Sequence, residues 1–325
     1  MKDQYGRQIN YMRVSVTDRC NLRCIYCMPE GGIEQVSHQD ILTYDEIVRI
    51  VRAAAAAGIT RIKLTGGEPL VRKNLAGLAA AVKAVSGIRE VTVTTHGVLL
   101  KEQVHDLVGA GVDAVNISLD TLDPAMYASV ARRDCLAAAL EGLEAAAACP
   151  GLKVKINCVP LKGINENQWI GLAGIAKDRP IDVRFIEMMP VGLGRDFRGS
   201  SQEDVLERLR EAFGPERPCS GHFGNGPAQY VSFAGFEGKI GFISAISHKF
   251  CSGCNRIRLT AEGFLKPCLQ YADGEDVRAL VRGGASDREL LQAVEKAIYR
   301  KPACHHFEAG DSSEFEHKDM FRIGG

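Results

Sequence analysis

Three cysteines in one short stretch are the clearest chemical signal of the sequence. Cys20, Cys24 and Cys27 are spaced C-x3-C-x2-C within DRCNLRCIYCMPEGG at 18–32. Three thiolates can hold three irons of a 4Fe–4S cube and leave the fourth iron open to a small molecule, whereas ferredoxin-type clusters use four cysteines. Zinc completed by a distant fourth ligand is the alternative that the spacing leaves open.

A second set of three cysteines lies near the C-terminus. Cys251, Cys254 and Cys268 are spaced C-x2-C-x13-C. A three-ligand metal site again has an open position, which is typical of catalysis or substrate binding. The alternative is a zinc ribbon in which His248 or Cys304 supplies the fourth ligand.

Several Lys and Arg residues occupy positions from which they could bind a phosphate group. Arg256 and Arg258 follow the second cysteine set at alternate positions of a predicted strand, so both side chains face one way and suit a phosphate. Other cations interrupt predicted strands of a buried sheet, where an unpaired charge is costly. These are Lys63, Lys155 and Arg184.

A glycine-rich turn, TGGEP at 65–69, follows the second predicted strand. Gly66 and Gly67 permit close approach of the backbone to a ligand, and Glu68 can align a cationic group. Without the cysteine stretch, a plain strand-to-helix turn would be the simpler interpretation.

The bulk composition is that of an ordinary globular enzyme. The chain has 325 residues, 46% hydrophobic and 25% charged, with 40 basic and 40 acidic side chains. The balanced charge does not indicate a nucleic-acid or membrane surface, and we expect neither partner. No signal sequence or membrane span is visible, so we expect a cytoplasmic protein whose eleven cysteines stay reduced.

Strand and helix patterns alternate over the first 190 residues, which predicts parallel strands with right-handed crossovers. Six such units are fewer than the eight of a closed barrel, so an open doubly wound sheet or an incomplete barrel fits. Expected strands are 13–17, 61–65, 90–95, 113–120, 152–159 and 182–188. Expected helices are 42–58, 74–87, 101–111, 134–149 and 165–178.

The pattern changes after about residue 190. A Gly-rich loop, a helix at 201–214, four short strands, a late helix at 286–301 and a polar tail follow. We therefore predict two units, 1–195 and 196–325, the second a smaller α+β module. The polar signals of the first unit follow its strands, where the sites of α/β proteins lie.

The cysteine stretch, with Tyr26 before the last cysteine, and the TGGEP turn together resemble the radical S-adenosylmethionine (SAM) superfamily. The resemblance implies an α/β fold with an incomplete (βα)6 TIM-like barrel. It also implies a 4Fe–4S cluster on Cys20, Cys24 and Cys27 whose open iron binds SAM. Cleavage of SAM by one electron then gives a 5′-deoxyadenosyl radical that abstracts hydrogen from a substrate.

Nearly the whole chain resembles the cyclases of molybdenum-cofactor biosynthesis. The matching segments are RVSVTDRCNLRCIYC, TGGEPL, NISLDTLD, KINCV, RFIEMMPVG, CSGCNRIRL and the terminal IGG. The resemblance implies that the radical takes the ribose C3′ hydrogen of GTP, that C3′ attacks guanine C8, and that a second 4Fe–4S cluster on Cys251, Cys254 and Cys268 holds the guanine.

The resemblance also implies a set of ligand contacts at matching positions. For SAM they are Tyr26, Gly67, Ser118 and Met189. For GTP they are Arg13, Lys63, Thr94, Lys155, Arg184, Arg256, Ile257 and Arg258. GTP carries about four negative charges near neutral pH, so convergence of these cations in one cavity makes electrostatic sense.

The end of the chain has a role of its own in the resembling family. Gly324 and Gly325 match two glycines that thread into the active site and are needed for cyclisation. The family further implies a homodimer, a flavodoxin- or ferredoxin-type electron donor and a following enzyme that converts the cyclised nucleotide. His96 stands where the family usually has Asn, and we leave it out of the predicted site.

Two other functions remain open from the sequence. A radical SAM peptide maturase would also carry a second cluster, although such proteins usually have longer C-terminal cysteine sets. A zinc-stabilised binding protein would perform no redox chemistry, and its metal content would distinguish it.

Overall fold

Six parallel strands form the centre of one curved sheet, and the inside of that curve holds the site. In a computed structural model, the structure describes residues 1–34, 36–221, 223–308 and 312–324. The six strands pair in chain order. They are β1 (Tyr11–Ser15), β2 (Arg61–Thr65), β3 (Glu90–Thr95), β4 (Ala114–Ser118), β5 (Lys153–Cys158) and β6 (Asp182–Ile186).

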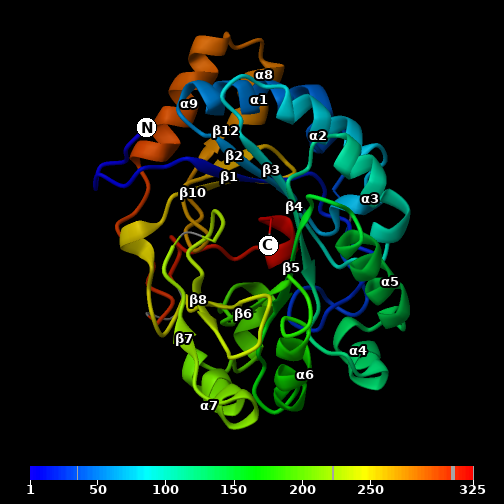
Figure 1. The fold of residues 1–325 in the computed structure, drawn as a ribbon. Helices are drawn as coiled ribbons and strands as arrows, with labels where there is room; N and C mark the ends of the chain where they lie inside the picture. Colours follow the sequence, from blue (N-terminus) through cyan, green and yellow to red (C-terminus); the bar gives the residue numbers. More distant parts are fainter. Residues whose placement is uncertain (35, 222, 309–311, 325) are drawn as a thin grey trace.

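Helices cover the convex face of these strands (Figure 1). They are α1 (Tyr44–Ala56), α2 (Leu75–Lys83), α3 (Leu100–Gly109), α4 (Pro124–Ala131), α5 (Leu136–Ala147) and α6 (Trp169–Gly174). A capping box opens α1, where Thr43 and Glu46 exchange hydrogen bonds. Helix α4 was not predicted, although Asp123 caps it and Pro124 opens it.

The later strands extend the same sheet at both edges. Strand β9 (Ile240–Ile243) runs parallel to β6, and β10 (Arg256–Leu259) runs parallel to β1. Antiparallel strands β8 (Gln229–Ser232), β7 (Arg217–Pro218), β11 (Phe264–Lys266) and β12 (Glu275–Asp276) complete the edges. Among the described residues β7 and β12 do not pair, so the barrel is incomplete, as predicted.

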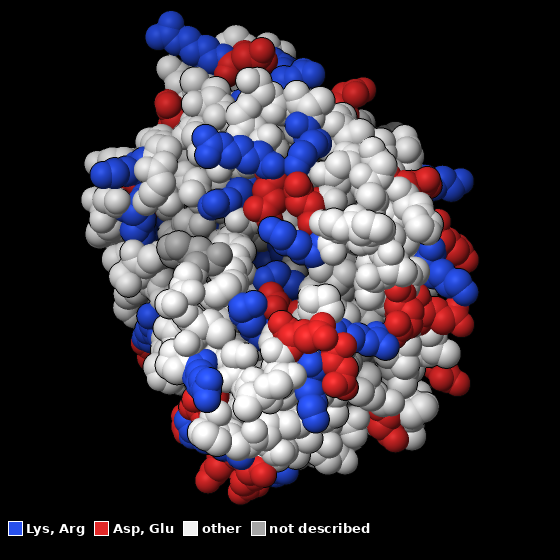
Figure 2. Space-filling model, viewed as in Figure 1, with Lys and Arg blue, Asp and Glu red and all other residues white. Residues whose placement is uncertain are grey.

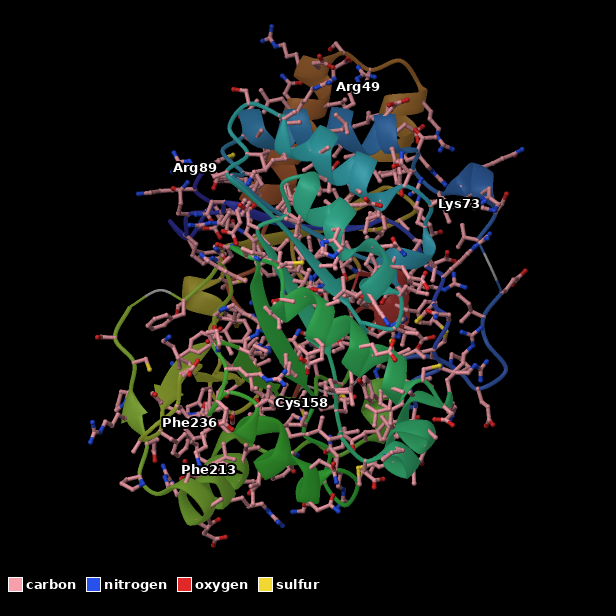
Figure 3. The ribbon with its side chains drawn as sticks, turned by 45° about the vertical axis from the view of Figure 1, so that its right-hand side comes forward. Arg49, Lys73, Arg89, Cys158, Phe213 and Phe236 are labelled. Atoms are coloured by element: carbon pink, nitrogen blue, oxygen red, sulfur yellow. The ribbon has the colours of Figure 1, made fainter. Side chains whose placement is uncertain are left out.

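The later helices pack outside this extended sheet. They are α7 (Gln202–Phe213), α8 (Val277–Arg282) and α9 (Asp287–Tyr299), and α9 lies along α1 (Figure 1). The Phe213 ring of α7 meets Phe236 edge to face at 5.1 Å, and the two are labelled together in Figure 3. Because the strands after residue 195 share the first sheet, the boundary between two units stays a prediction.

Six short 3-10 helices occur in the connections. They are η1 (His38–Asp40), η2 (Pro69–Val71), η3 (Glu166–Gln168), η4 (Gly192–Asp196), η5 (Cys251–Gly253) and η6 (Met320–Arg322). The predicted Gly-rich loop at 191–200 contains η4.

The tail enters the barrel (red in Figure 1) instead of fraying at the surface. Phe321 and Ile323 are fully buried, and Ile323 packs with Val191 and Leu269 in a small cluster of its own. Burial of these two side chains is the hydrophobic contribution that fixes the chain end inside. No helix of the described residues is long and apolar enough to cross a membrane.

The packing of α5 on the turn after β3 gives a stability prediction. A Cβ on Gly142 would lie 2.1 Å from the carbonyl oxygen of Gly97. We expect Gly142→Ala to lower the free energy of unfolding by about 1–3 kcal/mol through overpacking. Gly109→Ala, where a Cβ meets nothing within 4 Å, should be neutral or slightly stabilising. Chemical denaturation of both variants measures the difference, and equal stabilities would contradict this packing.

Candidate active site

A cavity of about 300 Å³ lies inside the open barrel, at the end where the first cysteine stretch leaves β1. All three cysteines of the first set line it, as do the four predicted SAM contacts and Thr94. A second cavity of about 250 Å³, lined by residues such as Arg195 and Phe307, contains none of the predicted site residues. The larger cavity is therefore the candidate active site.

Six cations converge on this cavity, as the sequence predicted. They are Arg13, Lys63, Lys155, Arg184, Arg256 and Arg258. Figure 2 shows Lys and Arg side chains around the hollow at the centre of the molecule. One of the eight members of the predicted nucleotide set is different: Ile257 is fully buried in the hydrophobic core, so its side chain does not line the cavity.

Strand register explains why the cations share one wall. Arg258 of β10 pairs with Arg13 of β1, which pairs with Lys63 of β2. Side chains at paired positions of neighbouring strands point to the same face of a sheet. On the other wall Lys155 of β5 pairs with Asn116 of β4.

Two of the cations are held by polar neighbours. Lys155 Nζ donates to Asp182 Oδ2 at 2.8 Å and to the Tyr230 hydroxyl at 3.1 Å. The Arg184 guanidinium donates to Asn116 Oδ1 at 2.7 Å and to Asn157 Oδ1 at 2.9 Å. The two asparagines orient Arg184 without neutralising it.

Other cations are poorly compensated. Burial, followed by the charges of Arg184 and Arg13, lowers the pKa of Lys63 well below its usual value. Among the described residues its ammonium group has no hydrogen-bond or ion-pair partner. Burial and then Arg13 lower the pKa of Arg258 to about 9. A bound polyanion would reverse both effects, because an opposite charge favours the protonated forms.

The chain end completes this wall. The Gly324 carbonyl oxygen accepts hydrogen bonds from Arg13 Nε at 3.3 Å and from Arg258 Nη1 at 2.6 Å. Gly324 adopts φ of +77°, which favours glycine. A Cβ here would also come within 3.2 Å of Ser15 Cβ. Gly325 lies outside the described residues.

The glycine-rich turn is tied to the first cysteine stretch by backbone contacts. Gly67 N donates to Thr17 O and Glu68 N to Arg19 O, each at 2.7 Å. A Cβ on Gly67 would stand 2.4 Å from Arg19 O. The backbone of Gly67 therefore lies against the cysteine stretch, where we had predicted that it lies against a ligand. Gly67 also lines the cavity.

Glu68 and His96 connect three loops. The Glu68 carboxylate accepts from Leu70 N, Thr95 Oγ1 and His96 N. These contacts tie its own turn to the turn after β3, and because Glu68 also lines the cavity, alignment of a cationic group by its carboxylate stays a prediction. His96 Nδ1 accepts from a backbone amide and Nε2 lies 2.6 Å from Asn21 Oδ1, which fits a neutral ring protonated at Nε2. Burial lowers its pKa in agreement.

His96 is a cavity residue that the sequence did not identify. Its ring joins Asn21, beside Cys20, to the strand end. The position of His96 directly after a predicted strand was the sequence feature that could have placed it in the site.

The first cysteine set has the chemistry of a cluster site. Burial raises the pKa of Cys20 to about 11 and that of Cys27 to about 12, so the thiols hold their protons until a metal displaces them. Tyr127 of α4, the helix that accepts hydrogen bonds from Arg23 N and Ile25 N on either side of Cys24, has a buried hydroxyl without a partner among the described residues. An orphaned donor on this helix fits an acceptor such as a cluster ligand.

The second cysteine set lies beside Arg256, outside the cavity lining. Cys251 begins η5, and the hairpin of β10 and β11 returns the chain to Cys268. Burial alone would raise the pKa of Cys254, but Arg256 and Lys301 lower it to about 6, which favours a thiolate ligand.

Neither set converges on one point. Within the described ranges no three His, Cys, Asp or Glu side chains are placed to hold a single metal ion. In a 4Fe–4S cluster each thiolate binds a different iron, so the cysteines need not point at one metal ion. Both sets therefore have the thiol ligands that such a cluster uses.

An acidic residue stands at the SAM side of the cavity. The Tyr26 hydroxyl donates to Asp120 Oδ2 at 2.6 Å, and Val159 N donates to Asp120 Oδ1 at 2.8 Å. Burial raises the pKa of Asp120 to about 6 despite these bonds. In the sequence, Asp120 was visible only as part of the NISLDTLD segment at the end of the fourth predicted strand. The hydrogen bond by which Asp120 links Tyr26 to this strand end was not predicted.

Comparisons with known proteins agree with this geometry. Residues 14–174 match the model of the Radical SAM superfamily, and residues 181–307 match that of Molybdenum Cofactor Synthesis C. A GTP 3′,8-cyclase of Clostridium perfringens is 42% identical over 325 residues, which is 100% of both chains. One of Heliobacterium modesticaldum is 46% identical over 310 residues, 94% of both chains.

Solved structures are similar in fold alone. Streptococcus suis SuiB bound to the precursor peptide SuiA has a TM-score of 0.61 and 16% identity over 95% of this chain and 68% of that chain. SuiB bound to S-adenosylmethionine has a TM-score of 0.59 and 17% identity, covering 92% and 78%.

The incomplete barrel, the cysteine stretch on β1 and the glycine-rich turn on β2 define a radical SAM enzyme. That class implies a 4Fe–4S cluster and the use of SAM, and Cys20, Cys24 and Cys27 stay the predicted ligands of the cluster. The full-length similarity is more specific, and the chain belongs to the GTP 3′,8-cyclase family.

The raised pKa of Asp120 gives a pH prediction. The folded chain binds this proton more tightly than the unfolded chain, so stability is highest below the ordinary pKa of 3.8 and is lost as pH rises through about 6. Asp120→Asn cannot ionise, so at pH 7.5 it should be more stable than wild type by up to about 3 kcal/mol.

Denaturation of the anaerobic protein between pH 5 and 8 measures this effect. The advantage of Asp120→Asn should shrink as pH falls, whereas exposed Asp106→Asn should follow wild type throughout. A pH profile of Asp120→Asn parallel to that of wild type would show that Asp120 is ionised normally.

Proposed function

We propose that the chain converts GTP into (8S)-3′,8-cyclo-7,8-dihydroguanosine 5′-triphosphate, the first step of molybdenum-cofactor biosynthesis. The observation that carries the proposal is the convergence of six cations on the cavity that the first cysteine set also lines. A SAM cluster site and a polyanion site in one cavity match a radical reaction on a nucleotide triphosphate. The names of the full-length relatives support the choice of GTP.

The cations bind the triphosphate and fix the nucleotide against the sheet. The triphosphate stabilises the charged forms of Lys63 and Arg258 most, because these charges are buried and poorly compensated in its absence. Arg184 keeps its orientation through Asn116 and Asn157. Thr94 adds a hydroxyl from β3. Ile257 contributes through its backbone only, since its side chain lies in the core.

SAM occupies the side of the cavity formed by Tyr26, Gly67, Ser118 and Met189. When bound, the first cluster supplies the electron for SAM cleavage, which leads to removal of the ribose C3′ hydrogen and bond formation from C3′ to guanine C8. The protein holds the reacting ribose near the cleaved SAM and excludes competing partners. The Tyr26–Asp120 hydrogen bond keeps the cysteine stretch in place over the strand ends.

A second 4Fe–4S cluster on Cys251, Cys254 and Cys268 holds the guanine. The cationic surroundings of Cys254 favour the thiolate that such a cluster needs. Arg256 lies between this set and the cavity and so joins the two sites.

The remaining partners follow from the family. A flavodoxin- or ferredoxin-type protein in the cytoplasm donates the electron, the enzyme acts as a homodimer, and a following enzyme converts the cyclised nucleotide.

Anaerobic incubation with SAM, a strong reductant and GTP tests the proposal. We expect 5′-deoxyadenosine and a cyclised nucleotide in equal amounts, both dependent on GTP, and neither from Cys24→Ala. Lys63→Ala should bind GTP at least about tenfold more weakly, because a charged contact is lost, and should still bind SAM. If deoxyadenosine formed only with a peptide, the maturase alternative would replace this function.

The position of Gly324 between Arg13 and Arg258 gives a second prediction. Removal of Gly324 and Gly325 should leave SAM binding intact but reduce the cyclised product at least about 100-fold, because the GTP-binding arginines lose their positioning contact. Lys318→Ala, which changes an exposed residue of the same tail, is the control and should keep wild-type activity. Full product formation by the shortened chain would refute the role of the tail.

A further inference from the structure

Tyr127 has a buried hydroxyl that no part of the proposed mechanism uses. The side chain is only 5% exposed, and its oxygen has no hydrogen-bond partner among the described residues. Buried polar groups are nearly always paired, so an orphan needs a physical explanation. One explanation is that its partner arrives with a bound group.

Helix α4, which carries Tyr127, lies directly on the first cysteine stretch. Arg23 N donates to Ala131 O at 3.0 Å and Ile25 N donates to Val130 O at 2.9 Å. These two amides flank Cys24 in the sequence. The two acceptors are the last carbonyl oxygens of α4, and Tyr127 stands one turn earlier on the same short helix. All three are buried.

The electrostatic environment of Tyr127 agrees with this placement. Burial raises the pKa of its hydroxyl, and among the charges that raise it further Cys24 has the largest effect, ahead of Cys135 and Asp120. The hydroxyl therefore remains protonated and is able to act only as a neutral donor beside a thiolate.

The thiols of the first set differ in their donors. Cys20 Sγ accepts from Leu22 N at 3.4 Å, and Cys27 receives a backbone hydrogen bond from Phe321 of the tail. Among the described residues, the Cys24 thiol receives a hydrogen bond only from its own backbone amide. The orphaned hydroxyl thus belongs to the helix that contacts the loop on both sides of a thiol with no donor from another residue.

We propose that Tyr127 is a positioning residue whose hydroxyl donates a hydrogen bond to the Cys24 thiolate once the first cluster is in place. The proton stays on tyrosine, and the electron that reduces the cluster comes from the donor protein. Reduction adds negative charge that the sulfurs share, so a donor to sulfur stabilises the reduced form and raises the potential. The inference rests on the first cluster and SAM, and is independent of GTP as substrate.

Tyr127→Phe in the cluster-loaded enzyme tests the inference. The phenyl ring keeps the packing of α4 and removes only the donor. In an anaerobic redox titration, the EPR signal that changes on addition of SAM reports the first cluster. We expect its one-electron equilibrium constant to fall about tenfold, which is a shift of about 59 mV to lower potential.

Two further measurements separate this role from a structural one. ENDOR after exchange into D2O should show an exchangeable proton coupled to the first cluster that Tyr127→Phe lacks. In the apo protein, the same substitution removes an unpaired hydroxyl and should leave the unfolding midpoint unchanged or raise it. Tyr271→Phe, which removes a hydroxyl bonded to Cys304 O near the second set, is the matched control and should not move the potential.

Equal potentials and equal exchangeable couplings in wild type and Tyr127→Phe would overturn the proposal. If Tyr127→Phe did not retain iron, Tyr127→Met would provide the same readout, because a flexible side chain adapts to the gap. Product formation from GTP is assayed separately, so failure of the proposed cyclase function would leave the potential shift measurable.

Discussion

Buried positive charge on the inner face of a parallel sheet is the constraint that organises this molecule. Charged side chains at buried strand positions are costly, yet Arg13, Lys63 and Arg258 stand side by side on three neighbouring strands. The strand alternation that turns them inward turns residues such as Met12 and Val14 outward, into the core beneath the helices. The barrel remains open enough to admit an anion, and the tail carbonyl of Gly324 supplies partial compensation.

The two cysteine sets differ in their electrostatic surroundings. In the first, burial keeps the thiols protonated even though Arg23 contacts Cys20. In the second, Arg256 and Lys301 favour the thiolate of Cys254, whereas burial raises the pKa of Cys251. The cations beside Cys254 are consistent with the proposal that the second set serves an anionic substrate. The tail lies near both cysteine sets. Ile323 packs against Leu269, which follows Cys268, and the Phe321 backbone donates a hydrogen bond to the Cys27 thiol.

Local patterns gave much of the fold correctly. The six central strands and most helices match the predicted ranges, because runs of apolar and β-branched residues and capping residues such as Thr43 act over a few neighbours. Helix α4 was missed, since it is only eight residues long and has almost no amphipathic pattern. The roles of Glu68 and His96 were also beyond local patterns, because their partners lie on loops distant in sequence.

The sequence by itself determined the class of chemistry: two open sets of three cysteines, a glycine-rich turn and cations within strands are recorded in residue type and spacing. Tertiary structure decided what those groups do together. Register placed Arg258, Arg13 and Lys63 in one row, burial took Ile257 out of the cavity, and the fold brought the chain end at Gly324 back to β1. Such contacts join residues far apart in the sequence, up to 311 positions for Arg13 and Gly324, and they form only when the whole sheet has assembled.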